Sequence, residues 1–353
     1  MNHIPLPAAV WAALAAALLF GASTPGAKML VGDIAPVMLA GLLYAGAGLG
    51  LALVIAARRL SGAASTPAGW IARGDLPWLA AAIAAGGVLG PVLLMVGLTT
   101  TSAASASLLL NLEGVFTALL AWFLFRENFD RRIALGMGLI VAGGVLLSRE
   151  PGAGDWSLGA LAIAGACACW ALDNNLTRRV SANDALTIAC VKGLAAAVVN
   201  VSIALALGHA LPDASRLAAA GGLGFLGYGV SLALFVVALR HLGTARTGAY
   251  FSLAPFFGAT LAVLALGETI SLALIGAGAL MAAGVWLHLT ERHEHEHEHL
   301  PLEHTHPHTH DEHHRPLHDF AWDGAEPHTH PHRHRRLRHT HPHYPDLHHR
   351  HEH

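Results

Sequence analysis

The chain has 353 residues, of which 54% are hydrophobic and only 12% are charged. Soluble globular domains carry about 25% charged residues, so this composition excludes an ordinary soluble fold and indicates a lipid bilayer as the solvent. The formal net charge of −2 also excludes a general electrostatic attraction to nucleic acid. We therefore expect an all-α integral membrane protein whose first partner is the membrane lipid bilayer.

Ten apolar segments follow one another along the chain, and each one predicts a membrane helix. A helix needs about 20 mostly apolar residues to cross the hydrocarbon core of a bilayer. In chain order the predicted helices are 7–27, 35–57, 77–98, 103–125, 132–148, 157–177, 184–208, 217–239, 246–266 and 270–289. The fifth is the shortest, and short loops with most of the charged residues connect the segments.

Lysine and arginine collect in the loops on one side of the predicted bundle. With a cytoplasmic N-terminus, ten of these residues fall in inside loops, whereas the outside loops hold only Lys28, Arg149 and Arg216. Cytoplasmic loops are enriched in these two residue types. The sequence thus predicts a multi-pass protein of the inner (plasma) membrane with both termini in the cytoplasm.

Two sequence patterns each occur twice in the apolar part of the chain. The segment FGASTPGAK (20–28) resembles WALDNNLTR (170–178), and residues 124–147 resemble residues 265–287. The two units that result, 7–148 and 156–289, hold five predicted helices each. Because five is odd, the second unit must cross the membrane in the opposite sense, which gives the inverted repeats that are common in secondary transporters.

The first of these units also resembles a known family. The run SLLLNLEGVFTALLAWFLFREN (107–128), followed by GMGLIVAGGVLL, is similar to the EamA family of the drug/metabolite transporter superfamily, and residues 248–287 fit the same pattern. Gly114 stands where the family usually has proline, and Ala254 stands where the first unit has Glu113. The resemblance implies ten helices, an alternating-access cavity between the halves, and transport of small metabolites or drugs, without naming a substrate. It does not cover the residues after 289.

Three ionisable residues lie deep inside predicted helices, where each costs about 2.5–3.5 kcal/mol to insert. They are Glu113, Asp173, which is followed by Asn174 and Asn175, and Lys192. One interpretation is a polar substrate cavity at the repeat interface, where Glu113 carries a proton or a cationic substrate and Lys192 pairs with Asp173 or meets an anionic substrate. The alternatives are a structural ion pair that holds helices together, and, for Lys192, a side chain that extends to the lipid headgroups.

Asn111 and Tyr250 are weaker candidates for the same cavity. Asn111 lies just before Glu113 and could share its hydrogen-bond network, although an amide between membrane helices is as often structural as ligand-binding. Tyr250 could line the path, although a packed aromatic ring is the simpler interpretation. Glu127 and Glu268, at the ends of predicted helices, are expected to cap the next helix or to pair with Arg131 or Arg132.

The C-terminal tail, residues 291–353, holds 22 of the 26 histidines. Imidazole binds zinc, nickel, cobalt and copper, so the tail is expected to bind divalent metal ions, although no cofactor is required for transport. The alternatives are pH sensing and a low-complexity tail without a cellular role. Proline, polarity and the lack of an apolar pattern predict that the tail is disordered. The histidines assigned to metal are His293, His295, His297, His299, His304, His306, His308 and His310.

Three functional hypotheses follow from these observations. The favoured one is a secondary transporter that moves a small organic metabolite or drug outward. The second is an exporter of nickel, cobalt or zinc that the tail supplies with metal, and the third is a membrane-anchored metal store or sensor. The sequence shows no nucleophile–base pair and no phosphate-binding loop, so an enzyme is not expected, and it leaves a homodimer open.

Overall fold

The computed structural model describes residues 6–61, 73–125, 131–149, 156–180 and 185–290, and four short segments of the tail, 294–299, 303–308, 328–333 and 337–342. The chain forms two compact units, Met1–Thr290 and Glu291–His353. In the described part of the first unit the regular elements are helices, joined by turns and loops, and one isolated bridge links Arg149 and Trp156. The tail unit contains strands.

Each of the ten segments that were predicted to be helical contains helix in the structure, and some of them are interrupted. The third consists of α3 (Leu76–Ala82), a π-helical turn and α4 (Gly90–Thr100), and the fourth of α5 (Ala103–Leu109) and α6 (Leu112–Phe125). The eighth consists of α10 (Ala214–Gly224), a second π-helical turn and the first part of α11 (Ser231–Phe251). Near the ninth, Gly243 interrupts α11 with a φ of 78°, which glycine adopts without strain. The helices are α1 (Leu6–Leu30), α2 (Pro36–Leu60), α3 (Leu76–Ala82), α4 (Gly90–Thr100), α5 (Ala103–Leu109), α6 (Leu112–Phe125), α7 (Arg131–Leu147), α8 (Leu158–Val180), α9 (Ala185–Ala206), α10 (Ala214–Gly224), α11 (Ser231–Phe251), α12 (Ala254–Leu266) and α13 (Leu272–Leu289), with π-helical turns η2 (Ile83–Leu89) and η3 (Phe225–Val230) and a 3₁₀ turn η1 (Arg73–Asp75).

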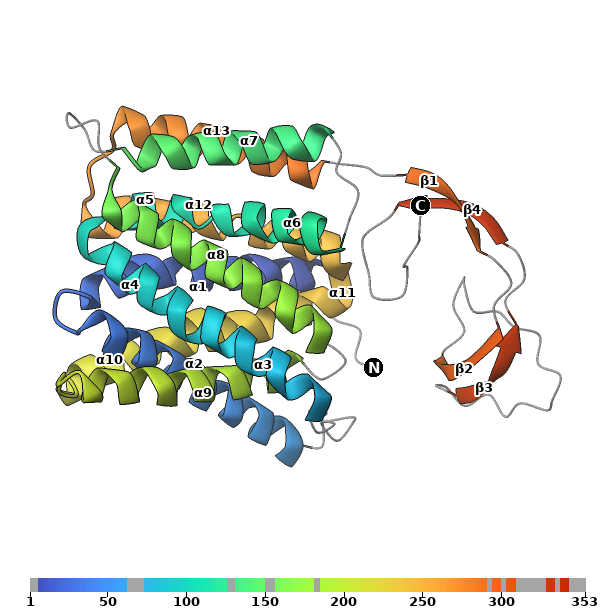
Figure 1. Ribbon diagram of the computed structural model, residues 1–353, viewed down its shortest axis with the longest axis horizontal. Coiled ribbons are helices and arrows are strands. Elements are labelled where there is room, and N and C mark those ends of the chain that lie inside the picture. Colours follow the sequence, from blue (N-terminus) through green and yellow to red (C-terminus); the bar gives the residue numbers. More distant parts are fainter. Residues whose placement is uncertain are drawn as a thin grey trace. The chain divides into compact units, whose positions relative to one another are not determined.

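Among the residues that the structure describes, eight helical stretches are long and apolar enough to cross a membrane. They are Pro7–Leu30, Pro36–Leu60, Leu76–Thr100, Ala103–Phe123, Leu186–Ala206, Ala214–Leu239, Arg246–Leu266 and Leu272–Leu289. The helix α7 stands outside this set with 17 residues, and α8 carries Asp173, Asn174 and Asn175 in its second half. The described helices therefore form a multi-pass membrane bundle, shown in Figure 1.

The helices of the bundle pack in a small number of extended pairs. α2 packs along α9 and α7 along α13, α1 contacts α11 and α12, α8 contacts α4 and α6, and α5 contacts α12. α7 and α13 lie side by side in Figure 1. Their backbones meet at Gly136 and Gly284, where a Cβ on Gly284 would lie 2.5 Å from the Gly136 carbonyl oxygen. Small residues of this kind permit close helix packing in membranes, where no hydrophobic effect drives helices together.

Two charged side chains form hydrogen bonds with backbone groups at the ends of helices that are distant from them in the sequence. Lys28, at the end of α1, donates to the carbonyls of Leu98 (2.5 Å) and Thr101 (2.9 Å) at the end of α4. Glu268 accepts the backbone N–H groups of Ala103 (2.7 Å) and Ala104 (2.8 Å) at the start of α5. Both contacts place a charge at the helix end whose unpaired backbone groups it satisfies. Glu268 thus caps a helix, but α5 and not the next helix in the chain, and Glu127 lies outside the described residues.

The structure describes two strand pairs in the tail. β1 (Glu294–His299) pairs antiparallel with β4 (Leu337–Pro342), and β2 (Glu303–His308) pairs antiparallel with β3 (His328–Arg333). Alternating sequences such as HEHEHEH have the two-residue period of a strand. His293 and His310, which were assigned to metal, lie outside the described residues.

Candidate functional site

The polar part of α8 is tied to α9 by an ion pair. The Nζ of Lys192 lies 2.5 Å from Oδ1 of Asp173, and its side chain is only 16% exposed. Thr177 bridges the pair, because its hydroxyl donates to Oδ1 of Asp173 (2.9 Å) and accepts from Lys192 (3.0 Å). The ammonium of Lys192 is therefore held by two side chains of α8.

Asp173 also lies directly against the π-helical turn η2. A Cβ on Gly86 would collide with Oδ2 of Asp173, so only glycine leaves room for this carboxylate. The carbonyl of Gly86 accepts two hydrogen bonds, from the hydroxyl of Tyr44 (2.9 Å) and from Nε1 of Trp170 (2.9 Å). A π-helical turn leaves carbonyls without their usual helical donor, and side chains of α2 and α8 supply donors here.

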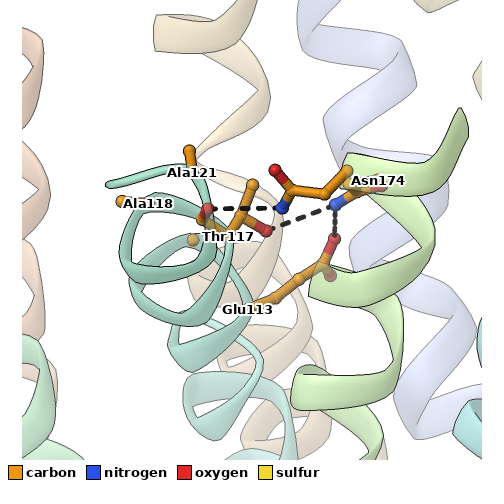
Figure 2. A pocket seen from close by; sticks show the side chains of 7 residues that line it. Glu113, Thr117, Ala118, Ala121 and Asn174 are labelled. Atoms are coloured by element: carbon orange, nitrogen blue, oxygen red, sulfur yellow. Dashed lines mark hydrogen bonds between the residues drawn. The ribbon is translucent and has the colours of Figure 1, made fainter. Parts of the chain in front are cut away.

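A pocket of about 430 Å³ lies between α6 and α8, next to this ion pair. Figure 2 shows the side chains that line it, with the amide nitrogen of Asn174 between the carboxylate of Glu113 and the hydroxyl of Thr117. Asn174 donates to Oε1 of Glu113 at 2.9 Å and reaches Oγ1 of Thr117 at 3.5 Å. The pocket therefore combines one carboxylate with an amide and a hydroxyl.

The rest of the pocket wall is small and apolar, with Gly114, Ala118 and Ala121 on α6. Asn175 closes the α8 side, where its amide donates to the carbonyls of Ala171 (2.9 Å) and Thr117 (3.4 Å). A Cβ on Gly114 would meet nothing within 4 Å. This wall leaves open space beside Glu113, on the side where the family pattern has proline.

Two of the candidate residues lie away from this pocket. The amide of Asn111, at the break between α5 and α6, donates to the carbonyl of Leu108 (2.9 Å) and contacts the sulfur of Met281 (3.8 Å). Tyr250 packs against an apolar cluster of α1 and α11 that includes Ala9, Ala13 and Leu242. The structure thus brings Glu113 and Asn174 together, and Asp173 and Lys192 together, but it does not join Asn111 or Tyr250 to them.

Thr117 and Thr177 belong to the site but were not singled out from the sequence. Thr117 follows Glu113 by four residues, and Thr177 follows Asp173 by four residues. Residues at this spacing share one face of a helix. The signal was therefore present, and a search for hydroxyl or amide side chains one turn away from each buried carboxylate would have found both threonines.

A second, smaller hollow lies where α1, α5 and α12 meet. It is lined by Phe20, Gly21, Thr24, Ser107, Leu110, Ala254 and Pro255. Here the helices are in close contact, because a Cβ on Gly21 would collide with the carbonyl of Ala254. A Cβ on Gly258 would lie 2.6 Å from the hydroxyl oxygen of Ser107. We call this contact of Gly21, Ala254, Gly258 and Ser107 the α1–α12 seal.

Within the described side chains, no group of three or more His, Cys, Asp and Glu residues could hold a metal ion. The histidine side chains of the tail lie outside that description.

The comparisons with known proteins agree with this architecture. The family model for the EamA-like transporter family matches residues 7–149 and again residues 157–290. A protein of Methanothermobacter thermautotrophicus, described as an uncharacterized transporter, is 34% identical over 211 residues, which are 57% of this chain and 60% of that protein. The match thus spans about three fifths of the relative's length.

One crystal structure aligns with 80% of this chain and with 95% of its own chain, at a TM-score of 0.58 and 22% sequence identity. At this identity the likeness concerns the fold alone. The family model, in contrast, covers most of the chain in two consecutive copies. The multi-pass helical bundle and the two consecutive family matches lead to one conclusion: the chain belongs to the EamA-like transporter family.

Proposed function

We propose that this protein is a secondary transporter that moves a small organic solute by alternating access. In this proposal ten helices span the membrane as two inverted repeats, 7–148 and 156–289, and α7 and α8 are the spans that length and composition alone do not select. The two consecutive matches to one family model support the repeat. Inverted repeats with a site between them are a common plan of such transporters.

The helix packing also supports the repeat, because several main contacts between the halves have a counterpart. α3 and α4 of the first half pack on α8 of the second half, and α10 and α11 of the second half pack on α1 of the first half. The contact of α6 with α8 likewise corresponds to that of α12 with α1. In both halves the third predicted helix contains a π-helical turn, at Ile83–Leu89 and at Phe225–Val230.

One observation carries the alternating-access mechanism: the two equivalent contacts are in different states. The internal alignment places Thr24 opposite Asn174 and Ala254 opposite Glu113. The contact of α6 with α8 contains the 430 Å³ pocket, whereas its counterpart, the α1–α12 seal, is closed by Gly21 and Gly258. A transporter that exposes its site to one side at a time requires one open and one closed contact, and exchange of these two states would reverse the access.

Uptake into proteoliposomes tests the proposal. The purified full-length chain is reconstituted and assayed against a panel of amines, amino acids, organic acids and neutral metabolites. We expect Glu113→Gln, Asp173→Asn and Lys192→Ala each to reduce transport of any solute that is carried. Asp33→Asn, an exposed carboxylate outside the pocket, is the matched control. Transport that none of the three substitutions changes would remove these residues from the mechanism.

We also propose that the tail binds divalent metal ions, because the strand register places histidines opposite one another. His295 pairs with His341 and His297 with His339 in β1–β4, and β2–β3 continues this pattern with His304–His332, His306–His330 and His308–His328. Directly opposed positions of antiparallel strands lie about 5 Å apart. Two neighbouring imidazoles are a favourable ligand set for zinc, nickel, cobalt or copper.

Metal titration of the full-length protein tests the tail proposal. Replacing His328, His330 and His332 by Asn removes one partner from each pair in β2–β3, whereas replacing His313, His314 and His318 removes the same number of histidines elsewhere. We expect the first variant to lose more zinc or nickel than the second. Equal losses would show that opposed pairs are not the binding unit.

Deletion of residues 291–353 then separates the roles of the tail. A metal exporter predicts that cells with the truncated protein become sensitive to metal and accumulate it. A store or sensor predicts that the tail alone, on an unrelated membrane anchor, restores the phenotype of a full deletion. A metabolite transporter with a separate metal-binding tail predicts that solute uptake in proteoliposomes survives the truncation.

A further inference from the structure

We propose that the pocket between α6 and α8 takes a small organic cation, a primary or secondary ammonium ion with a short apolar body. This inference rests on the proposed function, since it assigns a substrate class to the pocket of the transporter. The pocket volume of about 430 Å³ is in the range of small-molecule sites. Charge, hydrogen bonding and the apolar wall each favour a cation.

The charges near the pocket leave one carboxylate without a cation. Lys192 is engaged by Asp173 and Thr177, so its ammonium serves the neighbouring carboxylate and not Glu113. In the described ranges no lysine, arginine or histidine forms an ion pair with Glu113. When Glu113 is ionised, Glu113, Asp173 and Lys192 together carry one net negative charge. A carboxylate in a low-dielectric site is costly unless a cation compensates it, so a positively charged ligand is favoured there.

The hydrogen-bonding groups of the pocket leave acceptors for a ligand. The amide nitrogen of Asn174 is already directed at Oε1 of Glu113 and at the hydroxyl of Thr117. For Oε2 of Glu113, the described residues supply no hydrogen-bond donor. An ionised carboxylate only accepts, and an ammonium ion only donates, so the two are complementary. Hydrogen bonds between such charged groups are about twice as strong as neutral ones.

The same features disfavour the other classes of solute. An organic acid would place a second negative charge beside Glu113, and like charges in contact oppose binding. A neutral alcohol would occupy the space but would leave the carboxylate without a counter-charge. The small side chains of Gly114, Ala118 and Ala121 suit a short hydrocarbon body next to the charged head. Protonation of Glu113 would remove the preference, and this case is an outcome of the test below.

The test measures binding to the purified full-length protein in lipid nanodiscs near neutral pH. Radiolabelled phenethylamine and isoamylamine are the cationic probes, 2-phenylethanol and isoamyl alcohol the neutral ones, and 3-phenylpropionate and isovalerate the anionic ones. We expect saturable binding of an amine that the matched alcohol and acid do not displace. Glu113→Gln is expected to weaken amine binding at least about tenfold, as the loss of a hydrogen bond to a charged group does.

Two further variants distinguish the loss of the Glu113 charge from a general loss of folded protein. Glu113→Asp keeps the negative charge and is expected to retain the preference for amines over alcohols. Asp33→Asn removes an exposed carboxylate and is expected to leave amine affinity unchanged. Binding of the alcohols or acids in preference to the amines, or amine binding that Glu113→Gln leaves intact, would overturn the cation assignment, and so would the failure of every amine to bind.

The failure of this inference differs from failure of the transporter proposal. If the wild-type protein carries a neutral or acidic metabolite into proteoliposomes and Glu113→Gln abolishes that uptake, the transporter stands and only the substrate class is wrong. If amines bind but no solute of the panel crosses the membrane, the site is correct and the transport proposal fails.

Discussion

The ammonium of Lys192 on α9 contacts the carboxylate of Asp173 on α8 at 2.5 Å, with the hydroxyl of Thr177 bridging the two. The pair crosses between consecutive helices and lies beside, not inside, the α6–α8 pocket. Its side chains are 16% and 11% exposed, so water compensates little of either charge. The pair therefore fixes α8 against α9 and leaves Glu113 as the charged group of the pocket.

Breaking this ion pair on one side should destabilise the protein more than removing it entirely. Asp173→Asn leaves the Lys192 ammonium without its counter-charge, and the loss of one partner of a buried pair costs about 3–5 kcal/mol. The double variant Asp173→Asn with Lys192→Met removes both charges and should recover part of this loss. Thermal unfolding of the detergent-purified protein measures the difference. A double variant as unstable as the single one would contradict this account.

Gly86→Ala should displace the Asp173 carboxylate, because the new Cβ would occupy its position. Overpacking of this kind costs about 1–3 kcal/mol. Gly222→Ala in α10 is the matched control, since a Cβ there meets nothing within 4 Å and alanine favours a helix. Unfolding measurements on both variants check the prediction. In an Asp173→Gly background, which removes the whole side chain that the new Cβ would meet, the cost of Gly86→Ala should shrink, and a cost that stays the same would place the clash elsewhere.

Gly21→Ala and Gly258→Ala should open the α1–α12 seal. A destabilisation of the closed contact by about 1.4 kcal/mol shifts a two-state population about tenfold. The measurement uses a Ser107→Cys probe in a chain whose three native cysteines are replaced by serine, and follows its labelling by a membrane-impermeant thiol reagent. We expect faster labelling with either glycine variant.

Gly138→Ala in α7 controls for a general loosening of the bundle, because a Cβ at Gly138 meets nothing within 4 Å. Labelling of the Ser107→Cys probe should be unchanged in that variant. Equal labelling in all three glycine variants would show that the α1–α12 contact does not restrict access.

Glu268→Ala should loosen the start of α5. Glu268 accepts the N–H groups of Ala103 and Ala104, and loss of a helix cap costs about 0.5–2 kcal/mol. Hydrogen exchange should become faster at these two amides, and Glu268→Gln, which keeps one acceptor oxygen, should have a smaller effect. Ser271→Ala removes the cap of the neighbouring helix α13 and should affect the amide of Leu274 instead. Faster exchange at the same amides in both variants would contradict a specific cap.

The N-terminus of α10 should lose protection in acid. The Ser215 hydroxyl and the backbone and guanidinium groups of Arg216 donate to Asp213, and they hold the pKa of its carboxyl well below the usual range. A group whose pKa is lowered on folding stabilises the fold above its unfolded pKa, about 4, and this contribution disappears as the pH falls through the folded pKa. Amide protection factors at Ser215 and Arg216 should therefore fall in acid. Asp213→Asn should show little of this pH dependence.

Much of the fold could be predicted because a membrane helix appears in the sequence as a long run of apolar residues. Residues 35–57, for example, correspond to α2 (Pro36–Leu60). The π-helical turns could not be predicted. The glycines at 86 and 87 look like many others in this glycine-rich chain, and only the side chains of Tyr44, Trp170 and Asp173 around them distinguish that turn.

The site was predictable in part for the same reason. An ionisable residue in an apolar run is conspicuous, so Glu113, Asp173 and Lys192 stood out. Which of them would meet depends on the packing of α6, α8 and α9, which one sequence does not reveal. Asn111 lies two residues before Glu113, at the break between α5 and α6, where its amide contacts Met281 and not Glu113.

Asp173, Asn174 and Asn175 are consecutive, yet they contact three different groups: the lysine of α9, the carboxylate of Glu113, and the backbone of α6. Successive residues of a helix are about 100° apart around its axis, so these three contacts point in three different directions from α8. A turn of α8 by a few tens of degrees would strain all three at once. A solute that rotated α8 when it entered the pocket would thus directly change the contact between Asp173 and Lys192, because Asn174 and Asp173 are neighbours on the same helix.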